Sequence, residues 1–194
     1  MAPIMSSHDF PPETLTLPDG ARIAYRRGAA RTGDTRPGIV FLSGFASDMT
    51  GTKGTALAVW AEARGQALLR FDYSGHGRSS GAFRDGTIWR WTVDALAAID
   101  RLTAGPLILV GSSMGGWIML LAALARPDRI AGLVGIAAAP DFTAWGFSED
   151  QKMTILREGR LEEPSPYGDA PTVTTRAFWE SGEAMRLMHE VASE

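Results

Sequence analysis

The sequence predicts an α/β fold built on a mostly parallel sheet, and two patterns in the 194-residue chain support this prediction. From residue 39 onward, short apolar runs alternate with segments of helical spacing. The runs show no polar alternation, which is typical of strands covered by helices on both faces. Before them, residues 13–26 alternate around a turn at Pro18-Asp19-Gly20, which predicts an antiparallel hairpin at the edge of the sheet.

The expected elements follow one another in the order strand, helix, strand. We recognise each helix by apolar residues at intervals of three and four, and each buried strand by an unbroken apolar run. The expected strands are 39–42, 67–71, 107–110 and 130–138, and the expected helices are 56–64, 88–102, 114–125, 149–158 and 173–192. Residues 141–194 show no further buried strand. We therefore expect a single domain over residues 1–194, in which 141–194 form a small helical cap.

The composition excludes several classes of function. The chain is 45% hydrophobic and 21% charged, as in soluble globular proteins. A formal net charge of −3 without a basic patch argues against a nucleic-acid-binding protein. The chain has no cysteine, which excludes thiolate catalysis and Cys-ligated zinc, and it has no metal-binding motif. No signal peptide and no apolar run of membrane length is visible, so we expect a cytoplasmic protein without a membrane span.

The strongest chemical signal is the segment Gly111-Ser112-Ser113-Met114-Gly115, which fits the pattern G-x-S-x-G. An apolar strand precedes it and a helix follows, so Ser113 would stand at the apex of a sharp strand-to-helix turn. Such a turn exposes the hydroxyl above the sheet edge, and the helix N-terminus favours developing negative charge. We predict that Ser113 is a nucleophile. The alternative interpretation is a helix entry rich in Gly and Ser that carries no chemistry.

Acyl transfer to a serine needs two backbone N–H groups that bind the developing oxyanion. The residue after the nucleophile supplies one donor, which predicts this role for the amide of Met114. The second donor comes from the loop after the strand at 39–42, where Ser43-Gly44-Phe45 places the amide of Phe45. The alternative for this loop is a purely structural turn at Gly44.

Three stretches together resemble the α/β-hydrolases over residues 37–142. They are FLSGFASDMTGTK at 41–53, RFDYSGHGRSS at 70–80 and LVGSSMGGWIMLL at 109–121. Within that family they are similar to a branch with small bacterial carboxylesterases and a mitochondrial acyl-protein thioesterase that is also an acyl-glucuronide esterase. The resemblance implies an α/β-hydrolase fold, with Ser113 as nucleophile and Phe45 and Met114 as oxyanion donors. It also implies acyl ester or thioester substrates and no cofactor.

The triad of that family runs along the chain in the order serine, acid, histidine. This chain has three histidines, and we expect none of them to be the base. His76 lies in a glycine-flanked loop at another strand end, His189 lies in an expected helix, and His8 precedes all predicted structure. Asp141 follows the strand at 130–138, where some relatives carry the acid, but we expect it to be a loop or N-cap residue.

These observations predict that the chain is the N-terminal three-quarters of a hydrolase. The last strands of the fold, with their helices, would be absent from it, which amounts to roughly 55 to 60 residues. The strand at 130–138 would then be an exposed edge of the sheet.

The first functional hypothesis is a serine hydrolase that cleaves a small-molecule carboxylic ester or thioester through an acyl-enzyme on Ser113. Aromatic residues of the cap and strand ends predict an apolar acyl pocket, with packing as the alternative for each. They are Phe45, Trp117, Trp145, Phe147 and Trp179. The second hypothesis is a non-catalytic module of the same fold that binds an acyl ligand or a partner chain. The sequence leaves the oligomeric state open.

Overall fold

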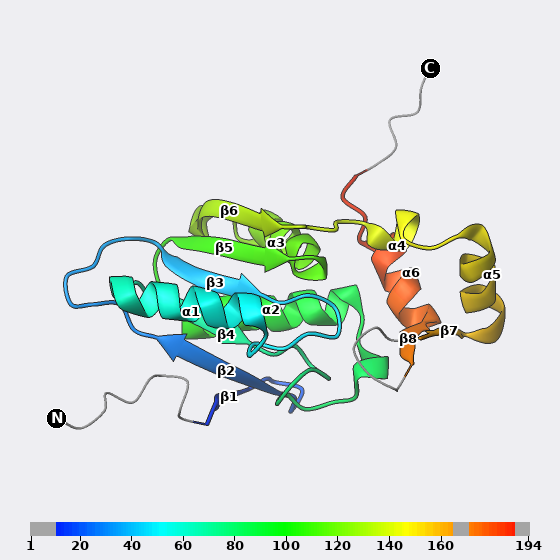
Figure 1. Cartoon of the computed structure of the whole chain (residues 1–194), viewed down its shortest axis with the longest axis horizontal. Helices are drawn as coiled ribbons and strands as arrows, with labels where there is room; N and C mark the ends of the chain where they lie inside the picture. Colours follow the sequence, from blue (N-terminus) through cyan, green and yellow to red (C-terminus); the bar gives the residue numbers. More distant parts are fainter. Residues whose placement is uncertain (1–10, 165–170, 189–194) are drawn as a thin grey trace, which may run out of the picture.

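The computed structural model describes residues 11–164 and 171–188 and places a six-stranded sheet at the centre of the chain (Figure 1). The strand order is β1-β2-β4-β3-β5-β6. The strands are β1 (Glu13–Thr16), β2 (Arg22–Gly28), β3 (Gly38–Leu42), β4 (Leu68–Phe71), β5 (Leu107–Ser112) and β6 (Ile130–Ile136). β1, β2 and β4 pair antiparallel, whereas β4, β3, β5 and β6 run parallel. This topology confirms the predicted hairpin and the mostly parallel sheet.

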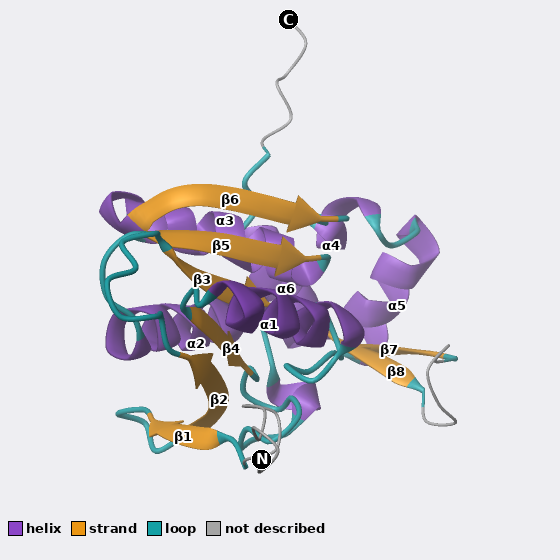
Figure 2. Ribbon diagram, turned by 60° about the vertical axis from the view of Figure 1, so that its left-hand side comes forward, coloured by secondary structure: helices purple, strands orange, loops and turns teal. Residues whose placement is uncertain are grey.

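Helices cover both faces of the sheet (Figure 2). The helix α1 (Thr52–Arg64) lies on one face, and α2 (Ile88–Leu102) and α3 (Met114–Ala125) lie on the other. The strand β3 shows why its run is wholly apolar. Its residues Val40 and Leu42 join the core under α2 and α3, while Ile39 and Phe41 join the core under α1.

The helix α1 begins at Thr52, four residues earlier than the apolar spacing predicts. The first turn of α1 shows no apolar periodicity, because the residue that packs against the sheet there is a glycine. Gly54 is buried, and a Cβ at this position would lie 3.1 Å from the Phe41 ring. The bounds of α2 and α3 agree with the prediction.

The cap lies beyond the carboxyl ends of the parallel strands (Figure 1). Its elements are α4 (Phe142–Trp145), α5 (Glu149–Glu158), β7 (Arg160–Glu163), β8 (Thr172–Thr175) and α6 (Arg176–Ala184). Two short 3₁₀ helices outside the cap are η1 (Phe83–Asp85) and η2 (Pro127–Arg129). None of the described helices is long and apolar enough to cross a membrane.

The predicted helix at 173–192 is wrong in its first part. Residues 172–175 form β8, which pairs antiparallel with β7, and the helix α6 starts only at Arg176. The four residues of β8 are Thr, Val, Thr and Thr, and such β-branched side chains favour a strand. The Thr175 hydroxyl then accepts the amide of Phe178 and begins α6. The helix α6 ends at Ala184, so the prediction is also wrong for residues 185–188, which are not helical. Residues from 189 onward lie outside the described part.

The strand β6 is an edge of the sheet, as expected for residues 130–138. It ends at Ile136, because Ala137 has a φ of 46° and leaves the extended conformation. The side chains of Leu133 and Val134 are 43% and 47% exposed. The prediction that every apolar strand is covered on both faces is therefore wrong for β6, whose helical cover is incomplete.

Candidate active site

Ser113 connects β5 directly to α3 in a strained conformation. Its φ of 52° and ψ of −121° lie in a region that glycine adopts readily and other residues rarely. Such backbone strain costs on the order of 1–3 kcal/mol and collects at functional sites. Ser113 is exposed, whereas its neighbours Ser112 and Met114 are buried. The turn thus presents one hydroxyl at the carboxyl edge of the sheet.

The glycines of the motif allow the close approach of backbone segments. A Cβ on Gly115 would collide with the carbonyl oxygens of Leu42 and Ser43 at the end of β3. A Cβ on Gly111 would lie 2.5 Å from the Gly115 carbonyl oxygen. The first turn of α3 therefore packs directly on the ends of β3 and β5, which is possible only without side chains at Gly115 and Gly111, respectively.

The structure brings the loop after β3 beside Ser113. A Cβ on Gly44 would lie 3.3 Å from the Ser112 carbonyl oxygen and 4.0 Å from Ser113 Oγ. The amides of Phe45 and Met114 donate no hydrogen bond to another described residue. Two backbone donors next to an exposed serine are the arrangement that an oxyanion requires. The geometry agrees with the predicted roles of Phe45 and Met114, which remain predictions.

Two charged residues of β4 and its following loop hold the loop after β3 in place. Asp72 Oδ1 accepts the amide of Met49 at 2.7 Å, and Arg70 Nη1 donates to the Met49 carbonyl oxygen at 2.9 Å. Asp72 Oδ2 accepts the amide of Arg78 at 2.9 Å, and burial raises the pKa of this carboxyl group. Sequence reasoning missed this anchoring. The available signal was a charged side chain at Arg70 inside an otherwise apolar strand.

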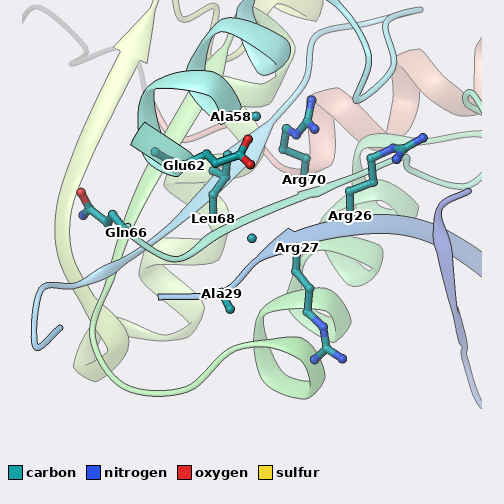
Figure 3. A pocket seen from close by; sticks show the side chains of 10 residues that line it. Arg26, Arg27, Ala29, Ala58, Glu62, Gln66, Leu68 and Arg70 are labelled. Carbon is teal, nitrogen blue, oxygen red and sulfur yellow. The ribbon is translucent and has the colours of Figure 1, made fainter. Parts of the chain in front are cut away.

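A cavity of about 580 Å³ contains Ser113 and the loop after β3. Its walls come from Phe41, from the loop and first turn of α1 over residues 43–54, and from Ser112 and Ser113. Its volume lies within the range of small-molecule sites. A second cavity, of about 240 Å³, lies between β2, β4 and α1 and contains none of the predicted site residues (Figure 3). The cavity at Ser113 is therefore the candidate active site.

Phe45 and Trp117, two of the aromatic residues predicted to form an acyl pocket, pack within the protein instead. The ring of Phe45 lies 4.9 Å from that of Phe83 and 5.2 Å from that of Phe178. The space that these rings share with Trp91 has no volume for a water molecule. Trp117 is fully buried in the core. In this conformation the rings of Phe45, Phe83, Trp91 and Phe178 leave no room between them for an acyl chain.

Trp145 and Trp179 use their indole N–H groups to hold the cap together. Trp145 Nε1 donates to the Pro140 carbonyl oxygen at 2.9 Å, although the side chain is 62% exposed. Trp179 Nε1 donates to the Thr143 carbonyl oxygen at 3.1 Å. These contacts favour the packing alternative for Trp179, whereas most of the Trp145 side chain is exposed.

His76 lies in an aromatic cage and is no base for Ser113. Its ring packs edge-on against Tyr73, Phe83 and Trp91 at centroid distances of 5.6, 5.0 and 4.9 Å. The side chain is 4% exposed, and burial lowers the pKa of the imidazole. His8 and His189 lie outside the described residues. Within the described ranges, no three metal-binding side chains gather into a site.

Asp141 has a loop role, as expected, but it caps no helix. It precedes α4 with a φ of 54°, and its side chain makes no cap hydrogen bond. The buried carboxylate instead accepts the amides of Leu187, at 2.9 and 3.0 Å, and Met188, at 2.6 Å. Asp141 thus ties the segment after α6 to the end of β6.

The site and the fold define the class of protein. Residues 37–163 match the family model of the alpha/beta hydrolase fold, and the chain belongs to this family. It is similar to a putative hydrolase from Agrobacterium vitis, with a TM-score of 0.81 and 40% identity over 91% of this chain and 73% of that one. Alpha/beta hydrolase domain-containing protein 10 from mouse gives a TM-score of 0.80 and 35% identity over 91% and 70% of the two chains.

Among curated proteins, the chain is similar to the human and bovine proteins named palmitoyl-protein thioesterase ABHD10, mitochondrial. The human protein is 37% identical over 90% of this chain and 57% of its own length. The bovine protein is 41% identical over 80% and 50%. The chain thus spans about half the length of the curated relatives it matches. The expectation of a cytoplasmic protein is wrong on this comparison, because these relatives are mitochondrial.

Proposed function

We propose that Ser113 is the nucleophile of a serine hydrolase that cleaves carboxylic esters or thioesters. The observation that carries this proposal is the exposed Ser113, held at a φ of 52° between β5 and α3 beside a cavity. Membership of the alpha/beta hydrolase family supports it, as does the similarity to proteins named thioesterases. A long-chain acyl thioester of the kind in those names is the first substrate class to test.

The reaction would proceed through an acyl-enzyme. Ser113 Oγ attacks the acyl carbonyl carbon, and the carbonyl oxygen becomes an oxyanion that accepts hydrogen bonds from the Phe45 and Met114 amides. The N-terminus of α3 adds a partial positive charge at this point. The alcohol or thiol leaves with a proton, and water then releases the carboxylic acid from Ser113.

An imidazole and a carboxylate are needed to activate Ser113 in this mechanism. No described histidine contacts Ser113, since the only one in the described ranges, His76, is enclosed by aromatic rings. We propose that residues outside the described part, or in a longer polypeptide of the relatives' length, supply both groups. The second candidate function, a non-catalytic module that binds an acyl ligand or a partner chain, is not favoured, because the relatives are named thioesterases.

Labelling with a fluorophosphonate probe tests the proposal. We expect the chain and its Ser112→Ala variant to take the label and the Ser113→Ala variant to take none. Ser112 is the matched control, because it is the neighbouring serine and is buried. Labelling that persists in Ser113→Ala would contradict the proposed nucleophile. A chain that is folded by circular dichroism and takes no label would show that the groups that activate Ser113 are absent from it, and the same test would then be made on a polypeptide of the relatives' length; no label there would support the binding module.

A further inference from the structure

We propose that the cavity beside Ser113 holds an oxyanion, a phosphate or carboxylate group, at the first turn of α1. The bound group would belong to the leaving half of the substrate, and this assignment alone rests on the proposed function. The proposal stands on three observations: an uncapped helix start, a buried hydroxyl without a partner, and an unpaired lysine. All three line the same cavity as Ser113.

The first turn of α1 presents free backbone donors to the cavity. The N-cap residue is Gly51, which has no side chain to accept them, and the first turn contains no acidic residue. The amides of Thr52, Lys53 and Gly54 donate to no described residue. Unsatisfied N–H groups at a helix start carry about half a positive charge and bind phosphate or carboxylate groups readily.

Ser43 is an independent sign of a polar ligand. Its side chain is 2% exposed, it lines the cavity, and its hydroxyl has no hydrogen-bond partner among the described residues. A buried hydroxyl without a partner costs free energy, so such groups in native proteins call for a ligand or another explanation. The Ser43 oxygen is inaccessible to water in this conformation, so an oxyanion in the cavity would accept this hydroxyl, together with the amides of α1, after the side chain rotates toward the cavity.

The charges around the cavity favour an anion only moderately. Lys53 and Asp48 are the charged residues that line it. Lys53 is exposed and forms no ion pair with a described residue. Asp48 opposes an anion, although its Oδ1 already accepts the Thr50 amide at 2.7 Å and the Thr50 hydroxyl at 2.6 Å. The lysine and the helix start together outweigh one carboxylate, so we expect weak but specific binding.

The polarity of the walls decides which half of a substrate carries the anion. Ser47, Thr50 and Thr52, which lie in the first turn of α1 or in the loop directly before it, make this part of the cavity polar. The aromatic rings around Phe45 lie toward the cap, where Phe142 and Phe178 belong to the same cluster. A polar, negatively charged leaving group suits the side of α1, because the packed aromatic rings around Phe45 leave no space for it.

Selective ¹⁵N-lysine labelling tests the site directly, because the chain contains only two lysines, Lys53 and Lys152. The amide spectrum therefore has two signals. The Lys152 amide donates to the Ser148 carbonyl oxygen within α5, which makes it an internal control. We expect inorganic phosphate at constant ionic strength to move the Lys53 signal in a saturable way and to leave the Lys152 signal in place. An unmoved Lys53 signal, with phosphate and with acetate, would overturn the proposal.

Acetate added in place of phosphate separates the two sources of the oxyanion. A Lys53 signal that moves with phosphate alone assigns a phosphate site, and one that moves with acetate assigns a carboxylate site. Both titrations are repeated on Ser113→Ala, in which the anion should bind as before. Failure of Ser113 as a nucleophile and failure of the anion site are therefore distinguishable.

A matched pair of variants at Gly51 sharpens the test. Gly51 has a φ of −56° and a ψ of 157°, which any residue adopts. Gly51→Asp places a carboxylate on the free amides, and we expect the half-saturating phosphate concentration to rise more than about tenfold. Gly51→Ala should leave the half-saturating phosphate concentration nearly unchanged. Ser43→Ala should raise this concentration about tenfold, which corresponds to the loss of one hydrogen bond to a charged group. Equal binding by Gly51→Asp and Gly51→Ala would contradict the site.

Discussion

Two groups of helix starts differ in how their backbone donors are satisfied. The helices α2, α5 and α6 each begin with a hydroxyl, from Thr87, Ser148 and Thr175, which accepts an amide of the first turn. Among the described helices of nine or more residues, only α1 and α3 lack a side-chain cap, and they begin with Gly51 and Ser113. The starts of α1 and α3 line the cavity at the carboxyl edge of the sheet, whereas the four-residue helix α4, which is also uncapped, does not.

The difference separates the scaffold from the site. A capping hydroxyl stabilises a helix by about 1 kcal/mol, so its omission at both cavity-lining helices has a cost. In return, the donors of α1 and α3 remain available to a ligand and to a developing oxyanion. Removal of the first hydroxyl should therefore destabilise the capped helices and leave the uncapped ones unchanged or stabilised.

The largest effect is expected at the first turn of α3. Gly115→Ala should lower the free energy of unfolding by about 3 kcal/mol, because its Cβ would collide with backbone oxygens of Leu42 and Ser43. Gly132→Ala in β6 is the control, since a Cβ there would only make an ordinary contact of 3.6 Å with Ile108. Urea unfolding measures both, and equal losses would contradict the close packing of α3 on β3.

Relief of the strain at Ser113 should stabilise the protein. Ser113→Gly keeps the turn without a Cβ, and we expect the free energy of unfolding to rise by about 1 to 2 kcal/mol. Ser112→Gly lies in the strand β5 and should lower it by about 0.5 to 1 kcal/mol. Chemical denaturation of the two variants checks the opposite signs. A destabilised Ser113→Gly would show that the turn is not strained.

Removal of a cap should destabilise a scaffold helix by a smaller amount. Thr87→Ala deletes the hydroxyl that accepts the Arg90 amide at 3.0 Å, and we expect a loss of about 1 kcal/mol. Thr52→Ala, at the start of α1, removes a hydroxyl that caps nothing and should change stability by less than about 0.5 kcal/mol. Thermal unfolding compares the pair. A loss at Thr52 as large as at Thr87 would remove the distinction between the two kinds of start.

The smallest effect concerns pH and the buried His76 beside the start of α2. Burial lowers its pKa below the usual 6.5, so the unfolded chain binds this proton more readily than the folded chain. Its contribution to stability is complete above pH 6.5 and declines as the pH falls toward the lowered pKa. We expect His76→Phe to flatten the decline in the free energy of unfolding between pH 7 and pH 5. An unchanged slope would show that His76 titrates normally.

The sequence was sufficient to predict the positions of elements that show a local hydrophobic pattern. The apolar runs of β3 and β5 and the amphipathic spacing of α2 are such patterns, and their positions were predicted within about two residues. The strand-to-helix turn at Ser113 was predictable for a similar reason, since its glycines and its place between a strand and a helix form a local motif.

Other features depend on contacts between distant residues, which no local pattern reveals. The strand β8 is defined by its pairing with β7, and the start of α1 by the contact of Gly54 with Phe41. The hydrogen bond between Met49 and Asp72 joins residues 23 positions apart. Ser43 is buried because segments distant in the sequence pack around it. The aromatic residues predicted a pocket, but several of their rings pack against one another and leave no space between them. The composition of the sequence does not determine the distances between these rings.

A crystal structure of the fluorophosphonate adduct would test the central claim most directly. The account predicts one phosphonyl group on Ser113 Oγ, with its oxygen about 2.7 to 3.1 Å from the amide nitrogens of Phe45 and Met114. Its leaving-group side should face the first turn of α1. An adduct on another residue, or an oxygen directed away from both amides, would contradict the proposed nucleophile and its oxyanion donors.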